Sequence, residues 1–443
     1  MAILLGNENL NVIEEVVLTS SQTYTARRTG VADVVCIGGG GQGGSCGKVS
    51  PGHLTHIVNA SGGGAGGYSR KRIPITAGDT FTVVVGAGGQ ANANKLPDSD
   101  GVKDGGAGGE STFDHASATA TIALDSNGGA GGVGNQTTSA SGATYAGGAG
   151  GTATGGDVNF TGGRGGTITR NNNASGEGTF ATGGGAVALF GAVFNGGDLN
   201  FTGSGHKQSA TGGAGIGGNG GDVAYDTGSA NSVCASGGGS ASGEGNGFTS
   251  THTAATTEAI TAFAKTDLVM GGGRLPSHGG QAACTNTITG CIAGNGGTGA
   301  LRAVLAGKGD STYNSIYGGN DRPTEVHDAA SFRPYSMIDG GLAQYPQPTG
   351  PGGGGGAACG TAGNNANTSV IAAGNGAAFA GGGGACSVVT NSELLNSTEL
   401  ISSSGRGGIG GGGSGGCILG TNTSSTVEWS SGGDGAVIIQ YLG

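Results

Sequence analysis

The sequence predicts a mainly β and irregular fold: a bundle of polyglycine-II helices, framed by a small β core that joins N- and C-terminal strands, with very little α-helix. Three observations lead to this class. Glycine contributes 108 of 443 residues, about 24% against about 7% in average usage. Because each helix-interior glycine costs about 1 kcal/mol relative to alanine, long α-helices are disfavoured. Hydrophobic residues still make up 35% and charged residues only 10%, which favours a packed structure over flexible glycine linkers.

The two ends of the chain carry the β-strand signals. Residues 14–26 and 31–37 are rich in β-branched and apolar residues, as is the C-terminal run 435–441. The natural partner of the C-terminal run is residues 32–37, which would tie both ends into one β core. Residues 73–76 and 81–86 read as a hairpin-like pair, with Ala77, Gly78 and Asp79 at its corner.

The glycines follow a GGx triplet in about ten blocks between these ends. A period of three is the repeat of the polyproline-II-type helix, whose backbone N–H and C=O groups point sideways and need partners in neighbouring helices. Glycine allows such close approach of backbones, and the third residue of each triplet can lie at the outer edge of a bundle. The blocks include residues 62–68, 105–110, 128–133, 147–152, 162–167, 212–222, 294–298, 352–356, 381–385 and 407–417.

A GGDxNFTG motif recurs along the chain. Complete copies occupy residues 155–162 and 196–203, and a looser one occupies 220–225. We expect each copy to end a glycine helix, to turn on its aspartate, and to insert an aromatic plug at the end of the bundle. The turn residues are Asp157, Asp198 and Asp222, and the plugs are Phe160, Phe201 and Tyr225.

Glycine becomes scarce between residues 247 and 350. Residues 253–264 and 300–305 are candidate short helices. The stretch 314–345 gathers aromatic residues and arginines, which are enriched at contact surfaces, although a local satellite core explains them equally well. The candidate receptor-contact residues are Tyr317, Arg322, Phe332, Arg333, Tyr335 and Tyr345.

Several patterns mimic catalytic or ligand-binding motifs. Residues 34–43 contain GxGxxG after a strand, but a poor helix former follows and the acidic residue required about 20 positions on is missing. Residues 217–222 resemble half of a calcium-binding nonapeptide repeat, yet such repeats work in tandem. His53 and His56 have no CxxC or carboxylate nearby. We therefore expect no enzyme, no cofactor and no metal site.

Charge and cysteine usage restrict the partners. The net charge is −10 and thinly spread, so the chain has no basic footprint for nucleic acid. It has no basic start followed by an apolar signal region and no apolar run long enough to span a membrane, so we expect synthesis in a cytoplasm without membrane insertion. Eight cysteines without a CxxC pair are expected to be mostly free and buried.

The chain resembles the glycine-rich domain of bacteriophage tail-fibre and adhesin proteins. The resemblance rests on the opening strand and glycine run at 24–41, the signature at 66–89, and the closing strand at 432–441. It implies a compact sandwich of polyglycine-II helices on a virion appendage, with distal loops that bind the host surface. The GGDxNFTG copies also recur in such fibres, whereas residues 247–350 have no counterpart in the family.

The expected function is therefore that of a virion structural protein, a tail fibre or fibre-tip adhesin presenting loops to a host-surface protein or glycan. Its partners would be fibre, baseplate or capsid proteins, and a homo-oligomer is compatible with the sequence. A decorating subunit without receptor binding is the nearest alternative, followed by an ice-binding protein. The expected organisation is an anchoring segment or ordinary extension at 1–15, a β-rich start at 16–115, a polyglycine-II array at 116–246, a loop-rich insert at 247–350, and a polyglycine-II return with the closing strand at 351–443.

Overall fold

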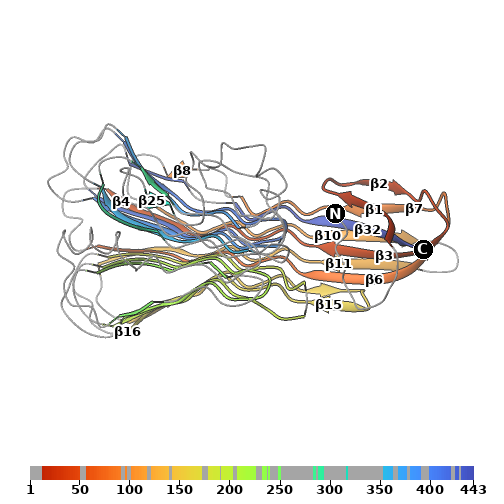
Figure 1. Cartoon of the computed structure of the whole chain (residues 1–443), viewed down its shortest axis with the longest axis horizontal. Coiled ribbons are helices and arrows are strands. Elements are labelled where there is room, and N and C mark those ends of the chain that lie inside the picture. The colour runs from red at the N-terminus through yellow and green to blue at the C-terminus, as the bar shows by residue number, and fades with distance from the viewer. Residues whose placement is uncertain are drawn as a thin grey trace.

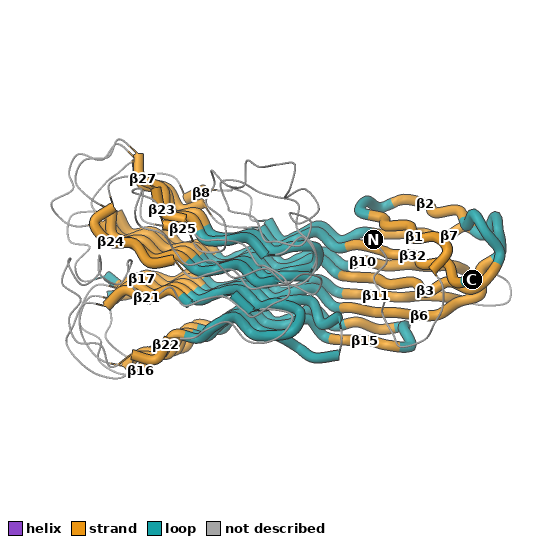
Figure 2. The backbone as a smooth tube through the Cα atoms, in the orientation of Figure 1, coloured by secondary structure: helices purple, strands orange, loops and turns teal. Residues whose placement is uncertain are grey.

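The protein has three parts in series: two β sheets at one end, a glycine bundle in the middle, and further sheets at the opposite end (Figures 1 and 2). The first and last described strands lie in the first pair of sheets, which we call the terminal end; the opposite end is the loop end. No helix occurs in the part of the chain described, which confirms the mainly β and irregular class. The computed structural model describes residues 12–49, 56–90, 95–96, 101–116, 121–138, 142–171, 178–189, 191–202, 207–225, 232–236, 238–239, 248–250, 283–285, 288–293, 316–317, 353–362, 368–376, 380–390, 399–420, 425–428 and 431–443.

The terminal end is a sandwich of two antiparallel sheets. Sheet I has the order β1 (Val12–Leu18), β32 (Ala436–Leu442), β3 (Gly30–Ile37), β6 (Tyr68–Ile75) and β15 (Val158–Phe160). Sheet II has the order β14 (Ala153–Thr154), β11 (Thr121–Ser126), β10 (Ser111–Ala116), β7 (Thr80–Val84) and β2 (Gln22–Thr25). The pairing of β32 with β3 confirms that the C-terminal strand joins the N-terminal strands. β1 begins at Val12, so part of the expected anchoring segment belongs to sheet I.

The hydrophobic core of this sandwich lies between sheets I and II. Its aromatic side chains include Phe81 and Phe113, whose ring centroids are 4.6 Å apart. The buried hydroxyls of Tyr24 and Tyr441 form a hydrogen bond of 2.8 Å across the two sheets. This bond satisfies two polar atoms that burial would otherwise leave without partners.

The expected hairpin over residues 73–86 is wrong. β6 pairs with β3 and β15 in sheet I, whereas β7 pairs with β10 and β2 in sheet II. The corner at Ala77 and Gly78 is present, and the carboxylate of Asp79 accepts the backbone N–H of Thr76 at 2.8 Å. The corner therefore carries the chain from one sheet to the other, because apolar residues on both strands fill the space between the sheets.

The middle of the molecule is held together by backbone hydrogen bonds with a period of three. Along one segment, the N–H groups of Gly38, Gly41 and Gly44 donate to the carbonyls of Gly67, Gly64 and Ser61, at 3.0, 2.7 and 2.8 Å. The N–H groups between them donate to other segments: Gly39 to Gly109, and Gly40 to Gly433. Each glycine segment therefore bonds to several neighbours in turn, as a polyglycine-II bundle requires.

Close packing explains why two of every three positions are glycine. A Cβ placed on Gly41 would lie 2.5 Å from the carbonyl carbon of Ala130 in the next segment. At the surface of the bundle the third residue of the triplet points outward, as exposed Ala130 and Ala149 do. In inner segments it is buried, as Ala65 and Gln42 are. The GGx pattern thus marks the positions at which no side chain fits.

The loop end contains four further sheets, which we number III to VI and whose strands are given below. They are stacked in the order IV, III, VI and V (Figure 2). Most neighbouring strands in these sheets are parallel, because successive segments return through the bundle in the same direction. Sheet III is β12 (Gly134–Thr137), β5 (Ile57–Ala60), β17 (Gly178–Ala181), β19 (Lys207–Ala210) and β21 (Ser232–Ala235). Sheet IV is β13 (Ala143–Tyr145), β16 (Ile168–Asn171), β18 (Leu199–Thr202), β20 (Val223–Tyr225) and β22 (Phe248–Ser250).

Sheets V and VI hold the described strands between residues 283 and 428, together with three earlier ones. Sheet V is β25 (Ile316–Tyr317), β23 (Ala283–Thr285), β27 (Thr368–Ala372), β29 (Glu399–Ser403), β31 (Ser425–Glu428) and β8 (Lys95–Leu96). Sheet VI is β24 (Ile288–Ala293), β26 (Ala358–Ala362), β28 (Cys386–Thr390), β30 (Gly416–Gly420), β4 (Ser45–Val49) and β9 (Gly101–Lys103). Small buried residues fill the space between sheets III and VI, including the free cysteines Cys46, Cys359 and Cys417.

Most of the expected insert at 247–350 lies outside the described residues, including both candidate helices. Its described strands, among them β23 and β24, lie in the loop-end sheets. Within the ranges given above, no helix is long and apolar enough to cross a membrane.

Candidate functional site

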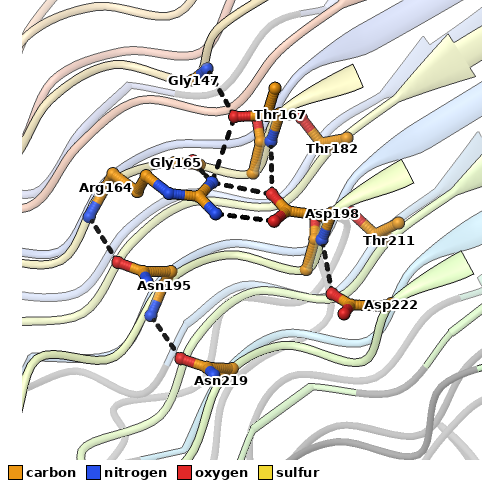
Figure 3. Close-up of polar contacts among 12 residues, drawn as sticks. Gly147, Arg164, Gly165, Thr167, Thr182, Asn195, Asp198, Thr211, Asn219 and Asp222 are labelled. Atoms are coloured by element: carbon orange, nitrogen blue, oxygen red, sulfur yellow. Dashed lines mark hydrogen bonds and ion pairs between the residues drawn. The ribbon is translucent and has the colours of Figure 1, made fainter. Parts of the chain in front are cut away.

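The junction between the glycine bundle and sheet IV is built from a repeated tetrapeptide. Residues 164–167, 195–198 and 219–222 have the form xGGx, and each runs directly into one of the parallel strands β16, β18 and β20. The strands are in register, with Ile168 opposite Leu199 and Leu199 opposite Val223. The first and the fourth residues of the three tetrapeptides therefore form two rows across the sheet (Figure 3). The first residues are Arg164, Asn195 and Asn219, and the fourth residues are Thr167, Asp198 and Asp222.

Each row is linked by side chains that accept the backbone N–H of the preceding segment. In the first row, the N–H of Arg164 donates to Asn195 Oδ1 at 3.0 Å, and that of Asn195 donates to Asn219 Oδ1 at 2.8 Å. In the second row, the N–H of Thr167 donates to Asp198 Oδ1, and that of Asp198 to Asp222 Oδ1, both at 2.7 Å. The side chains thus satisfy amides at the flank of the bundle.

A bidentate ion pair joins the two rows. The guanidinium of Arg164 donates to Asp198 Oδ1 and Oδ2 at 2.7 and 2.6 Å, and also to the carbonyl of Gly165 at 2.9 Å. The hydrogen bond to Asp198 raises the pKa of Arg164 above its usual value. A bidentate arginine–carboxylate pair fixes orientation as well as distance, so this contact orients the two segments that lead into β16 and β18.

A row of hydroxyls makes the corresponding junction of sheet III. The Thr182 hydroxyl donates to the carbonyl of Gly166 at 2.6 Å and accepts the N–H of Gly62 at 3.0 Å. Thr211 repeats this arrangement, donating to Gly197 at 2.6 Å and accepting from Gly183 at 3.1 Å. Ser236 continues it one segment further on, between the carbonyl of Gly221 and the N–H of Gly212. The hydroxyls therefore tie sheet III to the glycine segments that lead into sheet IV.

These junctions fix the positions from which three connecting segments depart. Residues 172–177, 203–206 and 226–231 join strands of sheet IV to strands of sheet III, and all three segments lie outside the described residues. The cluster combines ion pairing and hydrogen bonding with backbone amides. Its chemistry is that of a clamp, which holds the ends of the three segments at a fixed spacing.

The first copy of GGDxNFTG lies at the terminal end, far from this clamp. Asp157 is exposed in a bend between β14 and β15, and its carboxylate accepts the backbone N–H of Arg72 at 3.0 Å. Phe160 is half-buried and stacks on Tyr68, with ring centroids 5.8 Å apart. This copy precedes a glycine segment, in contrast to the expectation that every copy would end one.

The second and third copies differ from the expectation in another way. Asp198 and Asp222 do end glycine segments, but the chain continues into β18 and β20 without a turn, because both carboxylates are engaged by amides of the preceding segment. Phe201 and Tyr225 are paired positions of β18 and β20. Their side chains lie outside the description, so their role as plugs stays a prediction.

The candidate receptor-contact residues fall almost wholly outside the described part. Tyr317 belongs to β25, where it is paired with Ala283 of β23. The remaining candidates lie outside the described residues: Arg322, Phe332, Arg333, Tyr335 and Tyr345. Their gathering at one surface stays a prediction.

The GxGxxG segment is part of the bundle. The amides that a nucleotide phosphate would need already donate to protein carbonyls, for example Gly39 to Gly109 and Gly41 to Gly64. Cys46 is fully buried in sheet VI, while His53 lies outside the described residues. No group of three or more potential metal ligands occurs in the ranges that the structure covers.

Sequence reasoning singled out the aspartates of the clamp but missed Arg164, Asn195 and the hydroxyl row. A signal was present, because Asn195 and Asn219 have the same spacing of 24 residues as Asp198 and Asp222. Equal spacing of two residue types across two triplets indicates adjacent, in-register segments. The hydroxyls gave no comparable signal, since serine and threonine are common throughout the chain.

A bundle of glycine segments with period-three hydrogen bonds, capped by sheets at both ends, defines a structural scaffold of the glycine-rich type. Residues 17–256 match the family described as the glycine-rich domain, and the chain belongs to this family. No curated protein is significantly similar to the chain.

Proposed function

We propose that the protein is a virion structural protein, a tail fibre or fibre-tip adhesin of a bacteriophage, which presents loops to a host-surface receptor. The observation that carries this proposal is the separation of the two ends of the molecule: the first and last described strands, β1 and β32, lie in the sandwich of sheets I and II, whereas sheets III and IV lie at the opposite end of the bundle. An adhesin needs this separation, because one end must attach and the other must reach the receptor.

Rigidity supports the same function. Ordering a loop on binding costs affinity, so a scaffold that holds loop ends in place favours tight and selective recognition. The clamp of Arg164 and Asp198, together with the hydroxyl row, fixes the strands from which the loops depart. Variable loops on a fixed base are the arrangement by which other rigid scaffolds carry binding sites.

The terminal end would attach to fibre, baseplate or capsid proteins, and the loop end would meet a host protein or glycan. The protein would be made in the host cytoplasm and assembled into the virion, without enzymatic activity. Tyr317, Arg322, Phe332, Arg333, Tyr335 and Tyr345 are the proposed receptor contacts.

The test is adsorption of the purified chain to candidate host bacteria, read by cell-associated fluorescence and by protection of the cells from phage infection. We expect the wild-type chain to adsorb and to protect. The double variant Arg333→Ala with Tyr335→Ala should lose both effects, as should a chain with residues 203–206 replaced by a glycine–serine segment of equal length. Arg27→Ala is the matched control, because its exposed side chain lies at the terminal end.

Two outcomes would contradict the proposal. A chain that binds virion particles but no host cell would be a decorating subunit. Unchanged adsorption of the Arg333 and Tyr335 double variant would remove these residues from the contact surface, while loss in the 203–206 variant alone would place recognition on the loops between sheets III and IV.

A further inference from the structure

A polar groove lies on the flank of the glycine bundle. It has a volume of about 460 Å³ and runs between the segments 406–409 and 431–435. This volume falls in the range of about 300–1,000 Å³ typical of small-molecule sites. The side chains around it are mostly polar: Gln90, Asn375, Arg406, Ser431 and Asp434, with Ile409 as an apolar contact.

The floor of the groove offers little to a peptide backbone. The N–H groups of Gly407 and Gly408 donate to the carbonyls of Ser431 and Gly381, at 3.2 and 2.9 Å. Those of Gly432 and Gly433 donate to Gly89 and Gly411, at 3.2 and 2.9 Å. Because these donors are engaged within the bundle, an added strand would find few partners, and recognition must come from the side chains.

Two opposite charges stand in the groove without pairing with each other. Arg406 is exposed, and among the described residues no ion pair joins its guanidinium to a carboxylate. Its backbone N–H is fixed by Asn375 Oδ1 at 2.8 Å. Asp434 is exposed as well, and its Oδ1 accepts the N–H of Gly88 at 2.7 Å. The bundle therefore fixes the backbone of Arg406 and one carboxylate oxygen of Asp434, and leaves the guanidinium and the second carboxylate oxygen to face a ligand.

We propose that this groove binds a carboxylated sugar. Arg406 matches a carboxylate through two parallel N–H donors. Asp434, Gln90 and Ser431 supply acceptors and donors for hydroxyl groups, and half-buried Ile409 can contact the apolar C–H face of a sugar ring. The glycine floor lets one face of a sugar ring approach closely, because no side chain stands in the way. The site lies apart from the loop end, so it goes beyond the proposed host attachment.

The test is titration of the full chain with digalacturonate, followed by calorimetry and by the amide NMR signals of residues 431–435. We expect binding with shifts of those signals, and at least tenfold weaker binding of the uncharged digalactose. Arg406→Ala should weaken digalacturonate binding at least tenfold, and Arg406→Lys should recover part of the loss. Gln90→Ala, on another wall of the groove, should weaken it by a smaller factor. Arg27→Ala, an exposed arginine outside the groove, should bind like the wild type.

Since the Arg406 side chain is exposed, the variants should melt at the wild-type temperature, which separates loss of binding from loss of fold. Equal binding of the charged and neutral sugars would overturn the proposal, as would undiminished binding by Arg406→Ala. A short acidic peptide that binds as tightly as digalacturonate would show that the ligand is not a sugar. These measurements use purified protein and no cells, so failed host adsorption and failed sugar binding remain distinguishable.

Discussion

Replacing Gly64 by alanine would place a methyl group where a neighbouring backbone already lies. Gly64 is buried in the bundle, where its N–H donates to Ala130 at 2.9 Å and its carbonyl accepts from Gly41 at 2.7 Å. A Cβ on Gly64 would lie 2.5 Å from the carbonyl carbon of Ala149, and closer still to its oxygen. A normal carbon–carbon contact needs about 3.5 Å, so segment 147–152 must move by about 1 Å.

The size of the effect follows from the bonds that such a shift disrupts. The moving segment accepts at Ala149 from Ala130 and at Gly148 from Gly165, and Gly148 donates to Gly62, at 2.8, 2.9 and 2.8 Å. Each bond contributes about 1 kcal/mol net, and overpacking adds about 1–3 kcal/mol. We therefore expect Gly64→Ala to lower the free energy of unfolding by about 4–6 kcal/mol. For a chain of 443 residues, with an unfolding entropy of about 2.1 cal/mol/K per residue, this lowers the melting temperature by about 5 °C.

The assay is thermal unfolding followed by circular dichroism, with urea unfolding as a second measure. Ala149→Ser is the matched control: Ala149 is an exposed third position of a neighbouring triplet, and its substitution should change stability by no more than about 0.5 kcal/mol. A Gly64→Ala variant as stable as the wild type would refute the close-packed bundle. So would a control variant that loses as much stability as Gly64→Ala.

Three further predictions concern the clamp, the acid response and the buried thiols. Asp198→Asn keeps an acceptor for the N–H of Thr167 but loses the ion pair with Arg164. Since both ion-pair partners are partly exposed, it should lower the free energy of unfolding by only about 0.5–1 kcal/mol. Asp198→Ala also leaves the amide of Thr167 without its acceptor and should lower it by about 2 kcal/mol, as measured from urea unfolding midpoints. Burial raises the pKa of Asp33, but hydrogen bonds from Arg72 and Arg70 outweigh burial and hold this pKa below its usual value. The stability that the carboxylate contributes is present above the unfolded pKa of about 3.9 and is lost as the pH falls below it. Melting temperatures should therefore fall more steeply from pH 5 to pH 2 for the wild type than for Asp33→Asn. Burial also raises the pKa of the Cys36 and Cys417 thiols; their peptides should resist alkylation at pH 8 until the protein is unfolded, and rapid labelling of the native protein would contradict their burial.

The general architecture could be predicted because its signals are local. The triplet register marks the positions where a Cβ cannot fit, such as Gly41 and Gly64, and the apolar C-terminal run has an obvious partner in β3. The sequence also predicted the corner at Gly78, but it did not predict which sheet the strand on each side of the corner would join. Whether β6 and β7 pair with each other or face each other depends on strands far away in the sequence, and both arrangements bury the same alternating residues.

The clamp was only partly predictable for a related reason. Asp198 stands out in a repeated motif, yet its partner Arg164 precedes it by 34 residues and belongs to a segment without the motif. The residues of the first copy, Asp157 and Phe160, look equivalent in sequence but lie at the terminal end, because that copy precedes its glycine segment. The direction in which each segment crosses the bundle is a property of the whole chain, and a short motif does not encode it.

The place of β32 between β1 and β3 has a consequence for how the protein is made. Glu15 and Gln440 are hydrogen-bonded neighbours although 425 residues separate them. At about 5–20 residues per second, β1 waits roughly 20–85 s on the ribosome before the only strand beside it in sheet I is synthesised. β1 therefore has no partner strand in sheet I until translation reaches Leu442. A chain that stops short of β32 leaves β1 without the strand with which it pairs in sheet I.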